Sequence, residues 1–291
     1  MTSKTSVYQR VTDAVLAELA RGTAPWRKPW KAAFGLPRNL ISRRPYHGVN
    51  TLVLMTSALT AGYAANEWLT FKQAKDLGGF VRRGEHGQPV VFFKKVPAAQ
   101  DRDEETSWRW VFRTYTVFNA AQCANIAVPQ PPTLTWEPVE AAERVVARAG
   151  VPIRYAGGRA YYSPQQDRIT LPPRPAFDTV GGFYGTLLHE LVHATGHESR
   201  LARPFGPRGS DAYAWEELIA ELGSAMLSAV VGIPASDYPN IASYVDAWRR
   251  RMQRDARALG EAAAKAQKAA DWLLAKAGLS LPGDSEQGSE S

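Results

Sequence analysis

The chain has one cysteine, Cys123, among its 291 residues, so no disulfide can form within it. It has no apolar run of membrane-spanning length, and the segment that follows Met1 lacks the continuous apolar core of a signal peptide. These absences predict a protein of the reducing cytoplasm. We expect Cys123 to be a buried small hydrophobe, the alternative being a reactive thiol.

Histidine is scarce as well, but two of the five histidines stand four residues apart, in His-Glu-Leu-Val-His at 189–193. Apolar residues around them recur at helical spacing, which predicts a helix over about 180–195 that ends at Gly196. On such a helix His189 and His193 project from one face and can share a metal ion, with Glu190 beside them. The spacing is that of a zinc metalloprotease motif.

A catalytic zinc needs a third protein ligand, and a second helical segment at 213–221 offers one. Glu217 and Glu221 share a face of this segment. With Glu217 as the third ligand, the fourth coordination position stays open to water, as a catalytic zinc requires. Glu221, one turn further on, is expected to orient His189 through a hydrogen bond.

Three neighbouring residues are assigned other roles. Glu216 points elsewhere on the second helix and is expected to face solvent or to form a salt bridge. His197 is a further possible ligand, but Gly196 ends the helix before it, so we interpret it as a loop histidine. Tyr213 is a weak candidate for stabilising the oxyanion of the transition state, and the alternative is a core tyrosine.

The predicted reaction is metal-assisted peptide hydrolysis. A zinc ion held by these ligands lowers the pKa of water and polarises a carbonyl, and Glu190 then serves as general base. The alternative is a metal site that stabilises the fold and has no catalytic role. In place of Zn²⁺, the same ligands can take Mn²⁺, Co²⁺ or Ni²⁺ in a given preparation.

Two short strands around a turn are predicted at 161–171, where Ile169 and Leu171 alternate after a turn at 164–167. An edge strand beside the zinc helix can hold an extended peptide by strand addition. The alternative is a small sheet with no part in substrate binding, and the sequence leaves both open.

Positive charge is concentrated in the first part of the chain. Residues 1–128 hold 18 Lys and Arg against 9 Asp and Glu, a net +9, which leaves 17 against 19, a net −2, for residues 129–291. A proline-rich linker at 129–138 is expected to join two domains, a basic one at 1–128 and a metallopeptidase domain at 139–281. The tail at 282–291 is expected to be disordered.

Further helices are predicted at 7–20 and, as one or two amphipathic helices, over 241–278. A β-hairpin is predicted from a strand at 90–96 and a partner at 108–113 that alternates aromatic with other residues. Helices and strands that are not interleaved in a βαβ pattern place both domains in the α+β class.

The basic region interleaves cations with aromatic rings, a combination that neutralises a nucleic-acid backbone and stacks unpaired bases. No recognition-helix motif, zinc finger or basic heptad region accompanies it, so we expect single strands to be bound with little sequence preference. A core role is the alternative for any one ring, and we favour it for Trp108 and Trp110. The predicted contact residues are Trp26, Arg27, Lys28, Trp30, Lys31, Arg43, Arg44, Tyr46, Lys72, Arg82, Arg83, Lys94 and Lys95.

Several of these motifs, in order, resemble the N-terminal domain of ArdC-type antirestriction proteins. They are Trp-Arg-Lys-Pro-Trp at 26–30, Pro-Tyr-His-Gly-Val-Asn at 45–50, Trp-Leu-Thr-Phe-Lys-Gln-Ala at 68–74, Gly-Phe-Val-Arg-Arg-Gly at 79–84 and Val-Phe-Asn-Ala-Ala-Gln at 117–122. The segments at 188–197, 200–203 and 213–223 are similar to the zincin-like metallopeptidase domain of the same proteins. The resemblance covers nearly the whole chain.

The resemblance implies a plasmid or mobile-element protein in which a domain that binds single-stranded DNA precedes a zincin-like metallopeptidase domain. Such proteins are associated with protecting incoming DNA from host restriction during conjugation, and related N-terminal domains occur in plasmid primase-type proteins. His189, His193 and Glu217 carry over as metal ligands and Glu190 as catalytic acid/base. A substrate does not carry over, and a protein of the host is the possible one. The alternatives are a DNA-coating protein with a structural metal site and a conventional metalloprotease.

Overall fold

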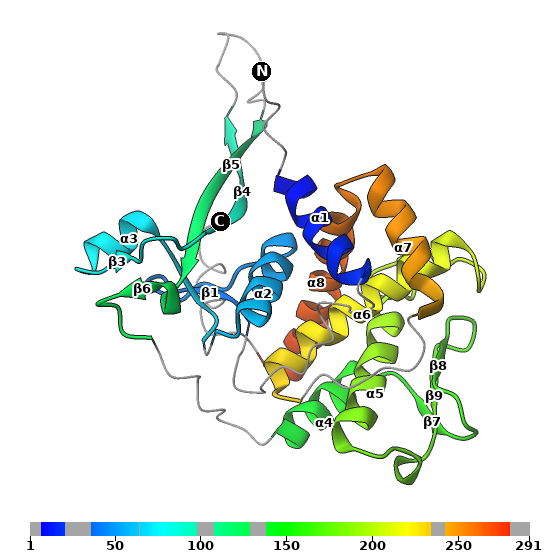
Figure 1. Ribbon diagram of the computed structural model, residues 1–291. Coiled ribbons are helices and arrows are strands. Elements are labelled where there is room, and N and C mark those ends of the chain that lie inside the picture. The colour runs from blue at the N-terminus through cyan, green and yellow to red at the C-terminus, as the bar shows by residue number, and fades with distance from the viewer. Residues whose placement is uncertain are drawn as a thin grey trace.

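A computed structural model describes residues 7–20, 36–63, 65–97, 108–128, 138–233 and 242–279 (Figure 1). The predicted linker, except its last residue Pro138, and the tail at 282–291 lie outside the described residues. The same holds for five of the predicted DNA contacts, Trp26, Arg27, Lys28, Trp30 and Lys31.

Separate groups of helices and strands confirm the α+β class. The helices are α1 (Val7–Ala20), α2 (Val49–Ala61), α3 (Phe71–Asp76), α4 (Pro138–Ala149), α5 (Val180–Thr195), α6 (Asp211–Val231), α7 (Ala242–Arg254) and α8 (Ala258–Ala277). The strands are β1 (Arg38–Asn39), β2 (Glu67–Thr70), β3 (Phe80–Val81), β4 (Gln88–Pro97), β5 (Trp108–Asn119), β6 (Cys123–Ala124), β7 (Ile153–Tyr155), β8 (Tyr161–Ser163) and β9 (Arg168–Leu171).

The N-terminal part is built on a four-stranded sheet in the order β1-β2-β5-β4. The predicted hairpin forms one side of this sheet, with β4 at the edge, and it is longer than expected because β5 continues to Asn119 and pairs with β2 as well as β4. The hairpin projects away from the helices in Figure 1. A small antiparallel pair, β3 and β6, lies beside this sheet and ends the part of the chain that precedes the linker.

The C-terminal part is a helical layer with a three-stranded sheet at one side. Helices α5 and α6 pack against each other and both pack against α8. Gly223 permits this approach, because a Cβ at that position would lie 2.9 Å from a methyl group of Val192 on α5. The sheet has the order β7-β9-β8, with β9 parallel to β7 and antiparallel to β8, so β8 is an edge strand.

The two parts share one connected apolar core. Helices α1 and α2 pack against α8, and α1 also packs against α7, which places Val15 and Leu54 in the same cluster as Leu273 (Figure 1). The buried hydroxyl of Thr12 on α1 donates a hydrogen bond to the carbonyl of Ala256, 2.9 Å away, between α7 and α8. The boundaries at 128 and 139 stay predictions, because a shared core does not define where either domain ends.

Local structure follows the sequence patterns closely. The helices predicted at 7–20 and 180–195 are confirmed, and the segment 241–278 forms two helices rather than one. Cys123 is buried, and burial raises the pKa of its thiol, as expected of a small core residue. None of the helices in the described ranges combines the length and the apolar character needed to cross a bilayer.

Candidate metal centre and nucleic-acid surface

Two capped helices bring the predicted metal ligands together. The Thr179 hydroxyl accepts a hydrogen bond from the Gly182 N–H and so fixes the first turn of α5, while Gly196 caps its end. Helix α6 begins in the same way, with Ser210 capping the N–H of Tyr213. Helices α5 and α6 pack against each other, and the two histidines of α5 lie buried at this contact, facing Glu217 of α6.

His189, His193 and Glu217 form a cluster whose spacing fits a metal ion. The two histidine Nε2 atoms lie 3.1 Å apart, and the Glu217 carboxylate oxygens lie 3.5 Å from Nε2 of His189 and 3.6 Å from Nε2 of His193. Ligands about 2.0–2.1 Å from a tetrahedral zinc are separated by about 3.3 Å. Two imidazole nitrogens this close also need a cation, or a proton on one of them, between them. The donor set therefore fits a divalent metal.

The other ring nitrogen of His193 is held by a buried ion pair that the sequence did not reveal. Arg203 binds both oxygens of Glu216, at 3.0 and 2.6 Å, and one of these oxygens lies 3.4 Å from Nδ1 of His193. A carboxylate can only accept a hydrogen bond, so Nδ1 carries the proton and the lone pair of Nε2 is directed at the cluster. We call the Arg203–Glu216 pair the brace of His193. Arg203 also donates to the Thr195 hydroxyl and the Val192 carbonyl, which ties the brace to the end of α5.

The charges in the cluster shift its pKa values strongly. Burial acts to lower the pKa of His193, but hydrogen bonds to Glu216 and Glu217 outweigh it and raise the pKa to about 10. Burial acts to raise the pKa of Glu217, but hydrogen bonds to His189 and His193 lower it overall. A negatively charged Glu217 therefore lies beside His193, whose protonated form is stabilised. A metal cation bound by the cluster can take the place of that proton.

Glu190 and Tyr213 lie beside the cluster. Burial raises the pKa of Glu190, against the opposing effect of the two histidines, which favours a proton acceptor working near neutral pH. Burial also raises the pKa of Tyr213, and a hydrogen bond to Glu217 adds to the effect, so the hydroxyl stays protonated and can donate. Tyr213 is half-buried next to the cluster, and its predicted role as an oxyanion stabiliser stays a prediction.

The predicted edge strand adjoins the cluster. Strand β8 packs against α5, and the backbone of Tyr162 in β8 lies close enough to Glu190 to act against the rise of its pKa. Arg200 fixes the strand, because its guanidinium binds Asp167 in the β8–β9 turn and donates to the Tyr162 hydroxyl at 3.2 Å and the Ala194 carbonyl at 2.6 Å. The end of α5 and the β8–β9 hairpin are thus joined through one side chain.

Three secondary predictions have different outcomes. Glu216 is not exposed to solvent: 2% of its surface is accessible and it forms the salt bridge that was the other alternative. His197 lies in the loop after α5, where its Nδ1 lies 2.8 Å from the Ser199 hydroxyl. Glu221 lies 3.8 Å from Nδ1 of His189, too far for a hydrogen bond in this conformation, so its orienting role stays a prediction.

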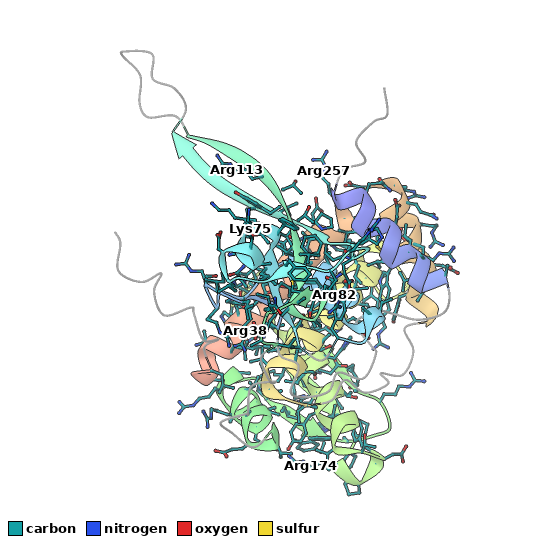
Figure 2. The ribbon with its side chains drawn as sticks, turned by 60° about the vertical axis from the view of Figure 1, so that its left-hand side comes forward. Arg38, Lys75, Arg82, Arg113, Arg174 and Arg257 are labelled. Carbon is teal, nitrogen blue, oxygen red and sulfur yellow. The ribbon has the colours of Figure 1, made fainter. Side chains whose placement is uncertain are left out.

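The predicted DNA contacts that the structure describes are mostly exposed. Figure 2 shows Arg82 among the cations that surround the N-terminal sheet, but its guanidinium is occupied by Glu85 and by the Ala121 carbonyl, at 2.8 and 2.7 Å. Lys94 and Lys95 lie in β4, and their side chains, like those of Trp108 and Trp110, fall outside the described residues. Besides Arg82, the predicted DNA contacts whose side chains are exposed are Arg43, Arg44, Lys72 and Arg83.

Tyr46 was predicted to contact DNA, but the structure places its side chain in the core. Only 5% of its surface is accessible, so its ring offers no face for stacking a base in this conformation. Its N–H donates to the Pro37 carbonyl and its carbonyl accepts from Thr51, which holds the residue in the core behind the sheet. The Arg-Arg-Pro-Tyr pattern suggested an exposed aromatic because it lies in a turn, but turn residues here pack against β4.

Two exposed rings lie on the hairpin, near the strand residues that carry positive charge. Phe92 on β4 and Tyr115 on β5 are 46% and 41% exposed and meet edge to face, with ring centroids 5.5 Å apart. Exposed Arg113 pairs across the strands with Phe92 (Figure 2). The predicted contact residues include none of these three, and Tyr115 lies beyond the predicted end of the strand at residue 113.

Comparison with known proteins agrees with both parts of this architecture. Residues 5–118 match the N-terminal domain of anti-restriction factor ArdC, and residues 140–265 match the zincin-like metallopeptidase family. The crystal structure of the antirestriction ArdC protein from plasmid R388 is similar over 93% of this chain and 97% of that one, with 39% identity and a TM-score of 0.79. The chain belongs to the ArdC antirestriction family.

Two other proteins, and a second structure of the R388 protein, are also similar to this chain. Protein y4eC of Sinorhizobium fredii is 40% identical over 94% of this chain and 92% of its own length. DNA primase TraC of Escherichia coli is 37% identical over 94% of this chain, but the match spans only 27% of TraC. The ArdC protein from R388 has also been solved in an Mn(II)-bound form, which is similar with a TM-score of 0.77.

Proposed function

We propose that this chain is an antirestriction protein that binds single-stranded DNA without strong sequence preference and carries a zinc-dependent peptidase site. In this role it protects incoming plasmid DNA from host restriction during conjugation, in the cytoplasm of the recipient. The observation that carries the proposal is the convergence of His189, His193 and Glu217 beside Glu190, in a chain of the ArdC family.

The three ligands leave room for a catalytic rather than a purely structural metal. They supply three protein donors, and a fourth coordination position open to water or substrate is what distinguishes catalytic from structural zinc sites. Two imidazoles and a carboxylate suit Zn²⁺, and since the R388 protein has been solved with Mn(II) bound, Mn²⁺ is the alternative. We propose Zn²⁺ as the working metal.

The residues around the metal divide the steps of peptide hydrolysis. A bound zinc ion lowers the pKa of water and polarises the substrate carbonyl. Glu190 takes the proton from the attacking water, because its raised pKa makes it a better acceptor, and returns it to the leaving amine. We assign to the Tyr213 hydroxyl, which its raised pKa keeps protonated, the role of donating to the developing oxyanion once Glu217 is engaged as a metal ligand.

The edge of β8 supplies a way to hold the substrate backbone. Because β8 pairs only with β9 in the described sheet, its other side can add an extended peptide as a further strand. Arg200 holds the strand at a fixed distance from α5 through Asp167 and Tyr162. Main-chain recognition of this kind selects extended segments rather than a particular sequence.

The DNA-binding part of the proposal rests on charge and exposed rings in the N-terminal part. The net charge of residues 1–128 is +9, from 18 Lys and Arg and 9 Asp and Glu. Phe92 and Tyr115 provide exposed aromatic faces next to Arg113, the combination that stacks unpaired bases while neutralising phosphates. We propose this hairpin as part of the interface, with the exposed members of the predicted set around it.

The test of DNA binding is fluorescence anisotropy of labelled single- and double-stranded oligonucleotides across a salt series, with the intact protein. We expect tighter binding of single strands of unrelated sequence, with an affinity that falls steeply as salt rises because phosphate contacts release counterions. Binding that is absent, or that does not change with salt, would exclude this part of the proposal and favour a conventional metalloprotease.

A further inference from the structure

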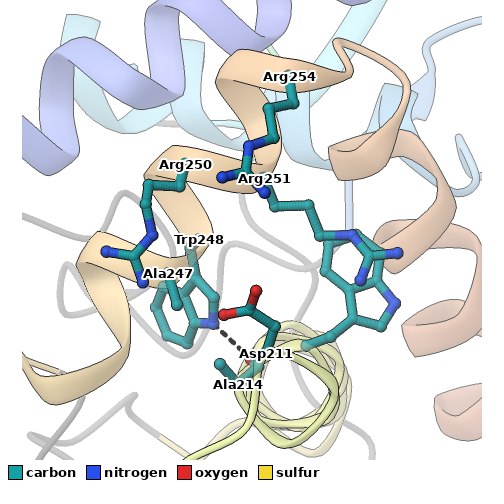
Figure 3. A pocket seen from close by; sticks show the side chains of 8 residues that line it. Asp211, Ala214, Ala247, Trp248, Arg250, Arg251 and Arg254 are labelled. Atoms are coloured by element: carbon teal, nitrogen blue, oxygen red, sulfur yellow. Dashed lines mark hydrogen bonds between the residues drawn. The ribbon is translucent and has the colours of Figure 1, made fainter.

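A cavity of about 210 Å³ lies between the start of α6 and the second half of α7. Figure 3 shows three arginines entering it from α7, with Asp211 projecting from α6 on the opposite wall. The residues that line it are Asp211, Ala214, Trp215, Ala247, Trp248, Arg250, Arg251 and Arg254. It is separate from the metal cluster.

The charge of this cavity is not balanced within the protein. Three arginines and one aspartate give its lining a net charge of +2. Within the described ranges, Arg250, Arg251 and Arg254 form no ion pair with a carboxylate. Like charges at positions i and i+4, as Arg250 and Arg254 are, destabilise a helix by about 0.2–0.5 kcal/mol per pair. The dipole of α7 favours one cation at its end, but it does not explain three that converge on one cavity.

The walls of the cavity are held in place. The Arg251 guanidinium lies 3.8 Å above the ring of buried Trp215, and the Trp248 indole N–H donates to the Ala214 carbonyl at 2.5 Å. A guanidinium stacked on an indole directs its N–H groups outward in its own plane. There they can donate to oxygen atoms of an anion. Arg250 and Arg254 flank it as exposed side chains. Such a planar, multi-donor arrangement suits a phosphate group.

The helix that carries these arginines packs against α1 of the N-terminal part, which is proposed to bind DNA. Helix α1 packs against α7 on one side and against β4 of the hairpin on another. The segment 249–257, around the end of α7, holds five arginines and one aspartate, although residues 129–291 together carry a net charge of −2. This local concentration lies next to the N-terminal part rather than beside the peptidase edge strand.

We propose that the α6–α7 arginine pocket binds phosphate groups of a single nucleic-acid strand that the N-terminal part also holds. The inference rests on the proposed single-strand binding and extends it to the zincin-like part. One strand then contacts both the N-terminal part and the zincin-like part. The zincin-like part binds the DNA through the arginines of its own pocket. A strand with phosphates at regular intervals is favoured over a single small anion because the basic segment continues beyond the pocket to Arg257.

The experiment compares single-strand affinity across a salt series for the intact protein and two double variants. Arg250→Gln with Arg254→Gln removes two of the three exposed pocket arginines and keeps Arg251, which stacks on Trp215. Arg144→Gln with Arg148→Gln is the matched control, because these arginines are also exposed and also four residues apart, on α4. Each phosphate contact to a single strand contributes about 0.7 to the slope of log affinity against log salt, so the pocket variant is expected to lose about 1.4 from the slope.

The outcomes are distinct. A shallower slope and weaker binding for the pocket variant, with the α4 control close to the wild type, support the inference, as does a gain in affinity for Asp211→Asn. A pocket variant with the wild-type slope overturns the inference and leaves the proposed function intact. An equal loss in the α4 control also overturns it, because general charge would then account for the effect. If the wild type binds no single strands, both fail. Equal thermal unfolding of the variants checks that the fold is unchanged.

Discussion

The residues of the metal cluster differ in how far the sequence alone predicts their roles. His189 and His193 could be assigned from the sequence because two residues four apart on a helix must share a face, whatever the rest of the fold does. Glu217 needed a guess about which second helix lies opposite. The role of Glu216 was out of reach, because its contact with His193 depends on how α5 crosses α6 and on Arg203 from the intervening loop.

The exposed rings of the hairpin provide the first prediction. Tyr115→Ala is expected to weaken single-strand binding by about 5- to 150-fold, since stacking of one base on an aromatic ring contributes about 1–3 kcal/mol. Tyr155→Ala is the matched control, because Tyr155 is also an exposed tyrosine but lies on β7. Anisotropy at one salt concentration measures both, and equal effects of the two substitutions would count against the hairpin surface.

At the scale of elements, the contact between α5 and α6 determines the metal site. Glu216→Gln is expected to lower metal affinity about 10- to 100-fold, because its NH2 group cannot accept the hydrogen bond from Arg203 Nε and the lost negative charge weakens the preference for a proton on His193 Nδ1. Competition titration of Zn²⁺ against a chelating dye measures this. Glu140→Gln on the exposed face of α4 is the control.

The Glu216 variant also leaves Arg203 without its partner, so circular dichroism of the same samples must establish that they are folded. Wild-type affinity in a folded Glu216→Gln protein would show that the brace does not orient His193. Smaller losses are expected for Glu221→Gln, since Glu221 lies 3.8 Å from His189.

The link between the β8–β9 hairpin and α5 predicts a dependence of stability on pH. The Arg200 guanidinium lowers the pKa of Asp167 below its unfolded value, so the pair stabilises the fold above about pH 4 and this contribution is lost as pH falls through the folded pKa. Asp167→Asn is therefore expected to cost about 1–2 kcal/mol at pH 7, allowing for partial exposure, and less at about pH 3.

Urea unfolding of metal-free wild type and Asp167→Asn at the two pH values measures the difference. Asp167 has a φ of 44°, in the left-handed region that asparagine also tolerates, so the backbone does not confound the comparison. An unchanged difference between pH 7 and about pH 3 would contradict the ion pair. The hairpin itself was predictable from its turn and its alternating strand, whereas its tether to Arg200 joins residues 33 apart and was not.

For the whole molecule, the sequence predicted a basic and a metallopeptidase part but not their shared core. Charge counts and a proline-rich stretch report where the chain changes character, and neither reports that α1 packs beside α7. The same averaging concealed the arginines of α7, because a net charge of −2 over residues 129–291 hides a local basic segment.

The shared core predicts that α1 contributes to the stability of the C-terminal part. Thr12→Val is expected to destabilise the protein by about 1–2 kcal/mol, since it removes the hydrogen bond to the Ala256 carbonyl and leaves that group unpaired. Thr186→Val on α5 is the control, because its hydroxyl bonds only to its own helix, at the Gly182 carbonyl. Equal urea midpoints for wild type and Thr12→Val would contradict the tie.

The central claim is that protection of incoming DNA depends on the metal site as a catalyst, in a protein that also binds single strands. The measurement that tests it most directly is survival of an unmodified plasmid conjugated into a restricting host, with wild type or Glu190→Gln supplied. We predict that Glu190→Gln loses protection while keeping its metal and its single-strand affinity. Full protection by Glu190→Gln would contradict the claim and leave a DNA-coating protein with a structural metal site.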